Sequence, residues 1–181
     1  MFNTIKSNAY EAFYIAMQDV EEIIEIYDIV NRDHPDKQPE ALKRSALVMA
    51  MTVWETYVED RFKELVGSYL MGVKGSPVYQ YIDGKVSNDL RYFHTPNSRN
   101  IKKLFEPILD RDVTEDWHWD NFDPKRAREK LNEYISLRGD VVHRSITDKQ
   151  NGHPVKKDEL HKCVRFLKSL TKAMESGLMC K

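Results

Sequence analysis

The chain has 181 residues, 41% of them hydrophobic, and only seven glycines and seven prolines, so we expect one domain built on long helices rather than a turn-rich β architecture. No apolar run approaches the roughly 20 residues of a membrane span, and the first residues lack the apolar core of a signal peptide, so neither is expected. The formal net charge is −1, but residues 1–123 hold 14 Lys and Arg against 22 Asp and Glu, a balance of −8, whereas residues 124–181 hold 14 against 7, a balance of +7.

The first two predicted elements are long helices. Residues 5–30 show one apolar stripe at spacings of three and four, which predicts an amphipathic helix. The stripe comprises Phe13, Met17, Val20, Ile24 and Tyr27. Two prolines and several turn formers interrupt the pattern over residues 31–39. A second helix is predicted from Pro39 to about Leu70, and its apolar stripe, which includes Trp54, is wide enough to predict a central helix with several neighbours.

The middle of the chain has the weakest helical pattern. Two glycines and Pro77 end the second helix, because these residues interrupt regular helical structure. Residues 76–96 are therefore predicted to be a long irregular connection. Within it we expect at most short helical pieces, around Val78–Ile82 and Val86–Tyr92.

Three further segments complete the predicted bundle. A short helix begins at Asn97 and continues to about Ile108, and the acidic, aromatic residues 110–123 are predicted to be an ordered loop. Asp123 and Pro124 supply the cap and first turn of a helix that ends near Arg144. After a polar loop, a last helix is predicted over 158–174. The expected fold class is an all-α bundle of four to five main helices in a single domain, residues 1–181.

Ionisable side chains gather at the end of the penultimate long helix. Residues 135–145 read ISLRGDVVHRS and contain Arg138, Asp140, His143 and Arg144. Five positions separate Arg138 from His143, which places them about 140° apart around a helix and roughly 7.5 Å apart along it. They do not share one narrow face. They could line one cleft if two copies of this helix met across a two-fold axis.

The arginine and histidine match the R-x4–6-H signature of HEPN domains, here as R-x4-H, and the chain resembles the RiboL-PSP-HEPN group. Three stretches carry the resemblance and follow one another in the expected order. They are ALVMAMTVWETYVEDRFKEL at 46–65, FHTPNSRNIKKLFEPIL at 93–109 and LRGDVVHR at 137–144. Together they span most of the chain, and they are considerably more specific than the short motif alone.

The resemblance implies an HEPN-type bundle that acts as a metal-independent endoribonuclease at a cleft formed across a homodimer. It further implies a role as a toxin or an anti-phage defence effector, with a neutralising antitoxin protein or a nucleotidyltransferase as partner. The chemistry agrees, because RNA carries its own nucleophile, the 2′-OH. His143 is suited to proton transfer because an imidazole titrates near neutral pH. Arg138 offers a planar fork of donors for phosphate oxygens. The products would be a 2′,3′-cyclic phosphate and a 5′-hydroxyl.

Other residues near the motif have two interpretations each. Asp140, counted with the catalytic residues, is placed to orient either Arg138 or Arg144. Many HEPN motifs have Asn, Asp or His directly after the arginine, whereas this chain has Gly139. That glycine either permits close packing of a partner helix or marks a decayed site. In the second case the chain is a non-catalytic HEPN module that binds RNA or a partner protein.

Two acidic residues of the central helix are candidates for supporting the motif. Glu55 and Glu59 resemble the acidic residues that contact the motif arginine in HEPN domains. The alternative is a structural ion pair or a solvated face.

Basic residues of the C-terminal part form a candidate RNA-binding set. They would contact the phosphate backbone if this part of the chain faces RNA. Alternatively, basic and acidic helices pair within the bundle, which would equally explain the charge asymmetry. The set comprises Lys149, Lys156, Lys157, Arg165 and Lys168, with Arg144 beside the motif.

Metal and nucleotide chemistry find little support. The six histidines show no ligand spacing such as H-E-x-x-H, and Cys163 and Cys180 lie 17 positions apart, so no metal or other cofactor is expected. No phosphate-cradling glycine loop is present. Because two cysteines form no disulfide framework, the expected location is the reducing cytoplasm.

Overall fold

The computed structural model describes residues 6–34, 39–143 and 155–179. Within these ranges the chain is all-α, as predicted, and its only β-type pairing is an isolated bridge between Trp119 and Phe122. The elements in chain order are α1 (Asn8–Asp33), α2 (Glu40–Tyr69), η1 (Met71–Val73), α3 (Pro77–Arg91), α4 (Ser98–Leu109), η2 (Val113–Asp116), α5 (Pro124–His143) and α6 (Lys157–Met179), where η marks a short 3-10 helix.

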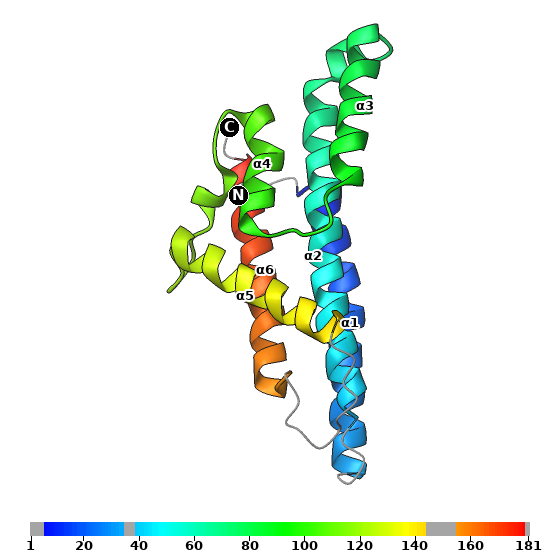
Figure 1. Cartoon of the computed structure of the whole chain (residues 1–181), viewed down its shortest axis with the longest axis vertical. Helices are drawn as coiled ribbons and strands as arrows, with labels where there is room; N and C mark the ends of the chain where they lie inside the picture. The colour runs from blue at the N-terminus through cyan, green and yellow to red at the C-terminus, as the bar shows by residue number, and fades with distance from the viewer. Residues whose placement is uncertain (1–5, 35–38, 144–154, 180–181) are drawn as a thin grey trace.

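Two long helices form the axis of the fold. α1 and α2 run side by side along the long direction of the molecule (Figure 1). The stripe predicted on the first helix is buried from Phe13 to Tyr27, and Ser7 caps this helix by accepting a hydrogen bond from the Tyr10 N–H at 3.0 Å. α2 buries side chains on several sides, including Trp54, which is fully enclosed. It is therefore the central helix that its wide stripe predicts.

The prediction of an irregular connection over residues 76–96 is wrong for most of its length, because α3 is one continuous helix. Pro77 occupies its first turn, and the Ser76 hydroxyl accepts the Tyr79 N–H at 3.2 Å, which together form a strong helix start. Ile82, Val86 and Leu90 then recur every four residues, and the last two are buried. This stripe outweighs the helix-weakening Gly84. The bundle accordingly has six α-helices in its described part, rather than four to five.

Gly84 provides a test of that continuous helix. A Cβ added there would meet nothing within 4 Å. Because glycine costs a helix interior roughly 0.5–1 kcal/mol relative to alanine, Gly84→Ala is expected to raise the free energy of unfolding by about that amount in urea denaturation. Gly177→Ala is the matched control and should destabilise, because a Cβ there would collide with the Asp116 side chain. A destabilised Gly84→Ala variant would contradict a regular helix at residue 84.

The remaining elements pack beside the α1–α2 pair and complete the core. The predicted ordered loop is confirmed: Trp117 is fully buried, and the Trp119 and Phe122 rings stack with centroids 4.9 Å apart. α6 carries its apolar face into the core and contacts both long helices, whereas α5 crosses α2 (Figure 1). No helix in the described ranges is both long and apolar enough to cross a membrane.

Candidate active site

The C-terminal half of α5 carries the motif arginine to the surface of α2. The predicted start of this helix is confirmed, because the Asp123 carboxylate accepts the Arg126 N–H at 2.7 Å and Pro124 is the first helical residue. Farther along, the Asn132 side-chain oxygen accepts the Ser98 N–H at 3.1 Å, which ties α5 to the start of α4. These contacts fix α5, whose C-terminal end reaches α2 (Figure 1). Arg138 lies in this part of the helix and meets Glu55 of α2.

Arg138 lies beside one of the two predicted carboxylates. Its Nη2 atom is 3.9 Å from an Oε atom of Glu55, and the two side chains are 29% and 18% exposed. The Arg138 Nε atom is buried and finds no hydrogen-bond partner among the residues that the structure describes. One edge of the guanidinium is thus held near a carboxylate, while a donor remains for a further acceptor. An arginine fork in this state can donate to a phosphate oxygen.

The Glu55 carboxyl has a mixed electrostatic environment. Burial raises its pKa, Arg138 acts in the opposite direction, Glu59 raises the pKa further and His94 lowers it. Burial also raises the pKa of Glu59, against the effect of Lys63. Among the described residues, Arg138 forms its ion pair with Glu55 and none with Glu59. The structure therefore brings only the first of the two predicted carboxylates to the motif arginine.

His94 is a titratable residue at this place that the sequence reasoning missed. It lies in the segment between α3 and α4 and is exposed, and its charge lowers the pKa of both Glu55 and Glu59. The contact that holds the segment on α2 is the Trp54 indole N–H, which donates to the Pro96 carbonyl at 3.2 Å. No sequence signal reports such a contact across 42 positions. The histidine stands inside one of the stretches that carry the family resemblance, but that stretch alone assigns it no role.

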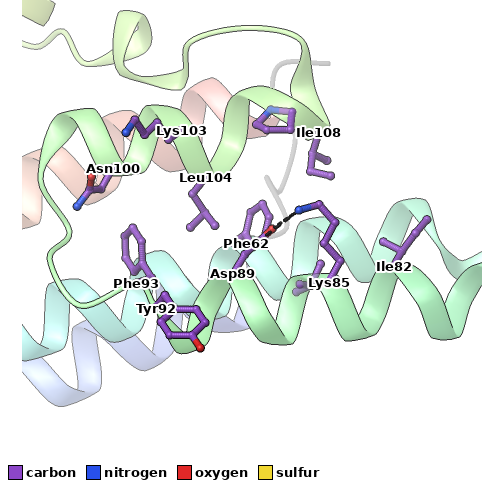
Figure 2. Close-up of a pocket in the computed structure, with 12 residues that line it drawn as sticks. Phe62, Ile82, Lys85, Asp89, Tyr92, Phe93, Asn100, Lys103, Leu104 and Ile108 are labelled. Atoms are coloured by element: carbon purple, nitrogen blue, oxygen red, sulfur yellow. Dashed lines mark hydrogen bonds and ion pairs between the residues drawn. The ribbon is translucent and has the colours of Figure 1, made fainter.

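A hollow between α3 and α4 marks the other end of the same segment. Its volume is about 420 Å³, and Figure 2 shows Phe62 of α2 and Phe93 among the side chains around it. Its only marked ion pair joins Lys85 and Asp89, 3.2 Å apart. The hollow is mostly apolar and contains no group suited to proton transfer near neutral pH.

The motif histidine lies where the described residues end. His143 is the last residue of α5, and its side chain lies outside the described part. Arg144 and Lys149 lie outside the described residues altogether. Asp140 is half-buried on α5, two positions after Arg138. The roles expected for these four residues remain predictions.

An apolar hollow adjoins the motif. Val141 and Val142, between Arg138 and His143, line it together with the first turns of α2, and its volume is about 440 Å³. Its lining is aliphatic except for Arg44 and Ser45. Val142 is 52% exposed. The open surface next to the motif therefore combines aliphatic side chains with Arg44 and Ser45.

The described residues of the predicted RNA-binding set divide into two that form ion pairs with α1 and two that are exposed. Lys157 pairs with Asp28 at 2.7 Å, and Lys168 pairs with Glu21 at 2.6 Å. Both acidic partners belong to α1. These two lysines therefore pair with acidic residues within the bundle, as the alternative interpretation of the charge asymmetry expects. Lys156 and Arg165 are exposed. In the described ranges, no group of three His, Cys, Asp or Glu side chains is arranged to hold a metal ion.

Comparison with protein families identifies the family of the chain. A family model described as RiboL-PSP-HEPN matches residues 17–179, a span that begins within α1, ends with α6 and includes Glu55, His94 and Arg138. No curated protein and no solved structure matches the chain.

Proposed function

We propose, from the premise that this chain belongs to the RiboL-PSP-HEPN family, that it is a metal-independent endoribonuclease with Arg138 and His143 at its centre. The observation that carries the proposal is the state of the Arg138 guanidinium. It is partly buried, lies 3.9 Å from Glu55 and keeps a buried donor without a described partner. A buried donor without an acceptor costs free energy. A phosphate oxygen is an acceptor of the matching kind.

The reaction uses groups that the chain and its substrate supply. His143 takes the proton of the 2′-OH, and the 2′-oxygen attacks the adjacent phosphorus. Negative charge then builds on the phosphorane oxygens, where the Arg138 fork stabilises it. The bond from phosphorus to the 5′-oxygen breaks, leaving a 2′,3′-cyclic phosphate on one product. The leaving 5′-oxygen takes up a proton and becomes a 5′-hydroxyl. Asp140 would orient the arginines of the motif.

A homodimer is part of the proposal. Five positions on an ideal helix separate two residues by about 140°, so one copy alone does not bring Arg138 and position 143 to one face, whereas two copies related by a two-fold axis could bring both kinds of side chain to one cleft. The open apolar hollow lined by Val141 and Val142 is a suitable surface for that contact. Gly139 lies on the same turn, and a Cβ added there would meet nothing within 4 Å among the described residues, which suits close approach of a partner helix.

Val142→Glu tests the dimer. A two-fold contact would place a carboxylate from each copy in an apolar interface, so we expect the dimer dissociation constant to rise about 100-fold or more and RNA cleavage to fall with it. Sedimentation velocity at micromolar concentrations measures the first effect. Ile15→Glu, which changes a 66% exposed isoleucine of α1, is the matched control and should remain dimeric. A wild-type chain that sediments as a monomer and still cleaves RNA would contradict a composite site.

The experiment that tests the function is incubation of the purified chain with single-stranded and structured RNA in excess EDTA. Cleavage that ends in 2′,3′-cyclic phosphates and is lost in both Arg138→Ala and His143→Ala supports the ribonuclease. Tight RNA binding without cleavage supports the second candidate, a non-catalytic HEPN module, which Gly139 favours. Absence of both would exclude an RNA function. Lys156 and Arg165, exposed at and near the start of α6, are the described residues that we expect to add backbone contacts.

The biological setting follows as part of the same proposal. A cytoplasmic ribonuclease of this family would serve as a toxin or an anti-phage effector. Its neutralising partner would be an antitoxin protein or a nucleotidyltransferase. Expression that slows growth of the host only when Arg138 and His143 are both intact would support that setting.

A further inference from the structure

The exposed aromatic side chains gather in one stretch of the chain. Residues 69–103 comprise the end of α2, η1, α3 and the first half of α4. Among the described residues three aromatic rings are exposed, and all three lie here: Tyr69, Tyr81 and Tyr92, which are 59%, 75% and 68% exposed. The other described tyrosines, tryptophans and phenylalanines are buried or half-buried. Grouped exposure of this kind is typical of a surface that binds another molecule.

The charge of this stretch is opposite to that of its surroundings. Residues 69–103 hold 6 Lys and Arg against 2 Asp and Glu, a balance of +4, whereas the remaining residues of 1–123 hold 8 against 20, a balance of −12. Lys74, Arg91 and Lys103 are exposed and form no ion pair with a described residue. Their charges are therefore available to an anion from outside the chain.

Tyr81 and Tyr92 lie on the same side of α3. Eleven positions separate them, which corresponds to about 20° around a helix and roughly 16 Å along it. The buried residues of α3 are Val86 and Leu90, so the exposed tyrosines face away from the core. α3 lies along the last turns of α2, and the tip where these two helices join extends past the other helices (Figure 1). This side of α3 is thus open along its length.

The hollow between α3 and α4 adjoins the Tyr92 end of this side. Tyr92 and Lys103 both line it and come from the two opposite helices (Figure 2). Its volume of about 420 Å³ lies in the range of sites that hold small ligands. An aromatic ring, a free positive charge and an apolar hollow therefore stand together, and each suits a different part of a nucleotide.

The chain after Tyr92 leads back towards the candidate active site. The Pro96 carbonyl accepts the hydrogen bond of the Trp54 indole at 3.2 Å. Trp54 directly precedes Glu55, the carboxylate that pairs with Arg138. The segment that follows α3 is therefore held on α2 beside the residue next to the partner of Arg138.

We propose that the exposed side of α3 binds single-stranded RNA, with unpaired bases stacked on Tyr81 and Tyr92 and backbone phosphates on Arg91 and Lys103. The inference rests on the proposed function for the class of its ligand, and it adds that the strand is unpaired. Exposed rings stack on the faces of free bases whatever the sequence, and nearby cations neutralise the phosphates. A duplex keeps its bases stacked on one another, so it offers these rings no free base.

The test compares the binding of a single strand with that of a duplex. Fluorescence anisotropy measures the affinity for a labelled RNA of about 12 nucleotides, alone and annealed to its complement, in chains that carry His143→Ala so that the RNA stays intact. Tyr81→Ala and Tyr92→Ala should each weaken single-strand binding about 10-fold and leave duplex binding unchanged. Tyr81→Phe and Tyr92→Phe keep the ring and should bind like the parent chain. Ile15→Ala, which shortens an exposed side chain of α1, is the control and should also bind like the parent chain.

The phosphate contact is tested through salt. Each neutralised phosphate contributes about 0.7 to the slope of log affinity against log salt concentration for a single strand. Lys103→Gln should therefore reduce the magnitude of that slope by about 0.7. Lys125→Gln, which removes an exposed charge at the start of α5, is the matched control and should keep the slope of the parent chain.

The outcomes separate this inference from the proposed function. Unchanged single-strand binding in Tyr81→Ala and Tyr92→Ala would overturn the inference and leave these rings to a protein partner, even if the wild-type chain cleaves RNA. Equal losses in the alanine and phenylalanine variants would overturn stacking as well. Ring-dependent binding by a chain that cleaves no RNA would support the inference and contradict the ribonuclease. A chain that binds no RNA at all would contradict both.

Discussion

Replacement of Arg138 by lysine is expected to lower the rate of RNA cleavage by roughly 10³-fold while leaving the fold intact. Lysine keeps the positive charge but loses the planar fork, so it cannot donate to two phosphate oxygens at once. A lysine ammonium also cannot stay beside Glu55 and present a second, fixed donor to the substrate, as the guanidinium can. If the site needed only a charge near the phosphate, the lysine variant would retain most of its activity.

The measurement is the single-turnover rate at saturating RNA, so that loss of binding does not mimic loss of chemistry. Arg126→Lys is the matched control on the same helix, because its exposed guanidinium donates to the Asn121 carbonyl, away from the site. It should cleave at the wild-type rate. Unfolding transitions of both variants should coincide with that of the wild type. Near-normal cleavage by Arg138→Lys would remove the arginine fork from the mechanism.

Glu55→Gln tests whether the position of Arg138 beside Glu55 contributes to cleavage separately from its donor fork. The amide keeps the size of the side chain but removes the charge beside Arg138, so the guanidinium is less well held, and a smaller loss of about 10-fold is expected from misplacement alone. Glu59→Gln should leave the Arg138 geometry unchanged, since the ion pair of Arg138 is with Glu55. The two variants make the same chemical change on neighbouring turns of α2, so Glu59→Gln serves as the matched control for Glu55→Gln.

Apolar periodicity was sufficient to predict the helices that face the core. The stripe from Phe13 to Tyr27 is buried as expected, because spacings of three and four place side chains on one face whatever the neighbours are. α3 was missed for a local reason. Its buried stripe is short, Gly84 lies among the stripe residues and weakens the helical pattern, and the cap formed by Ser76 and Pro77 equally indicates a turn.

Contacts between helices determine which carboxylate pairs with Arg138, and the sequence alone does not predict them. Glu55 and Glu59 stand four positions apart on one helix face, so their spacing gives no reason to prefer either as partner of Arg138. The crossing of α5 over α2 makes the choice. His94 could not be found from spacing either, because the segment that carries it is held on α2 by the hydrogen bond from Trp54 to Pro96, across 42 positions of the sequence.

Glu175, which lies outside the candidate active site, is the residue that we expect to contribute most to stability among those discussed. Glu175 of α6 is only 4% exposed, and it accepts hydrogen bonds from the Tyr57 hydroxyl at 3.1 Å, from Arg61 Nε at 3.0 Å and from the Ser7 N–H at 3.1 Å. Burial raises the pKa of Tyr57, and the neighbouring carboxylate raises it further, so this hydroxyl stays protonated as a donor. The cluster joins α6 to the centre of α2 and to the start of α1.

Glu175→Ala is expected to lower the free energy of unfolding by about 3–5 kcal/mol, because it leaves the buried Arg61 charge without its partner. For a chain of this size the corresponding fall in Tm is roughly 10 °C. Urea denaturation and thermal unfolding measure the two quantities. Glu129→Ala, which removes an exposed glutamate of α5, is the control and should change stability by less than about 0.5 kcal/mol.

A double variant identifies the cause of that loss. Arg61→Met combined with Glu175→Leu removes both charges and fills the space with apolar side chains, so it should be more stable than Glu175→Ala alone although it changes more atoms. A double variant at least as unstable as the single one would mean that Glu175 acts through its hydrogen bonds to Tyr57 and Ser7 rather than by compensating Arg61. In either case RNA cleavage below the unfolding transition should stay near the wild-type rate, because the cluster shares no side chain with the Arg138–Glu55 pair.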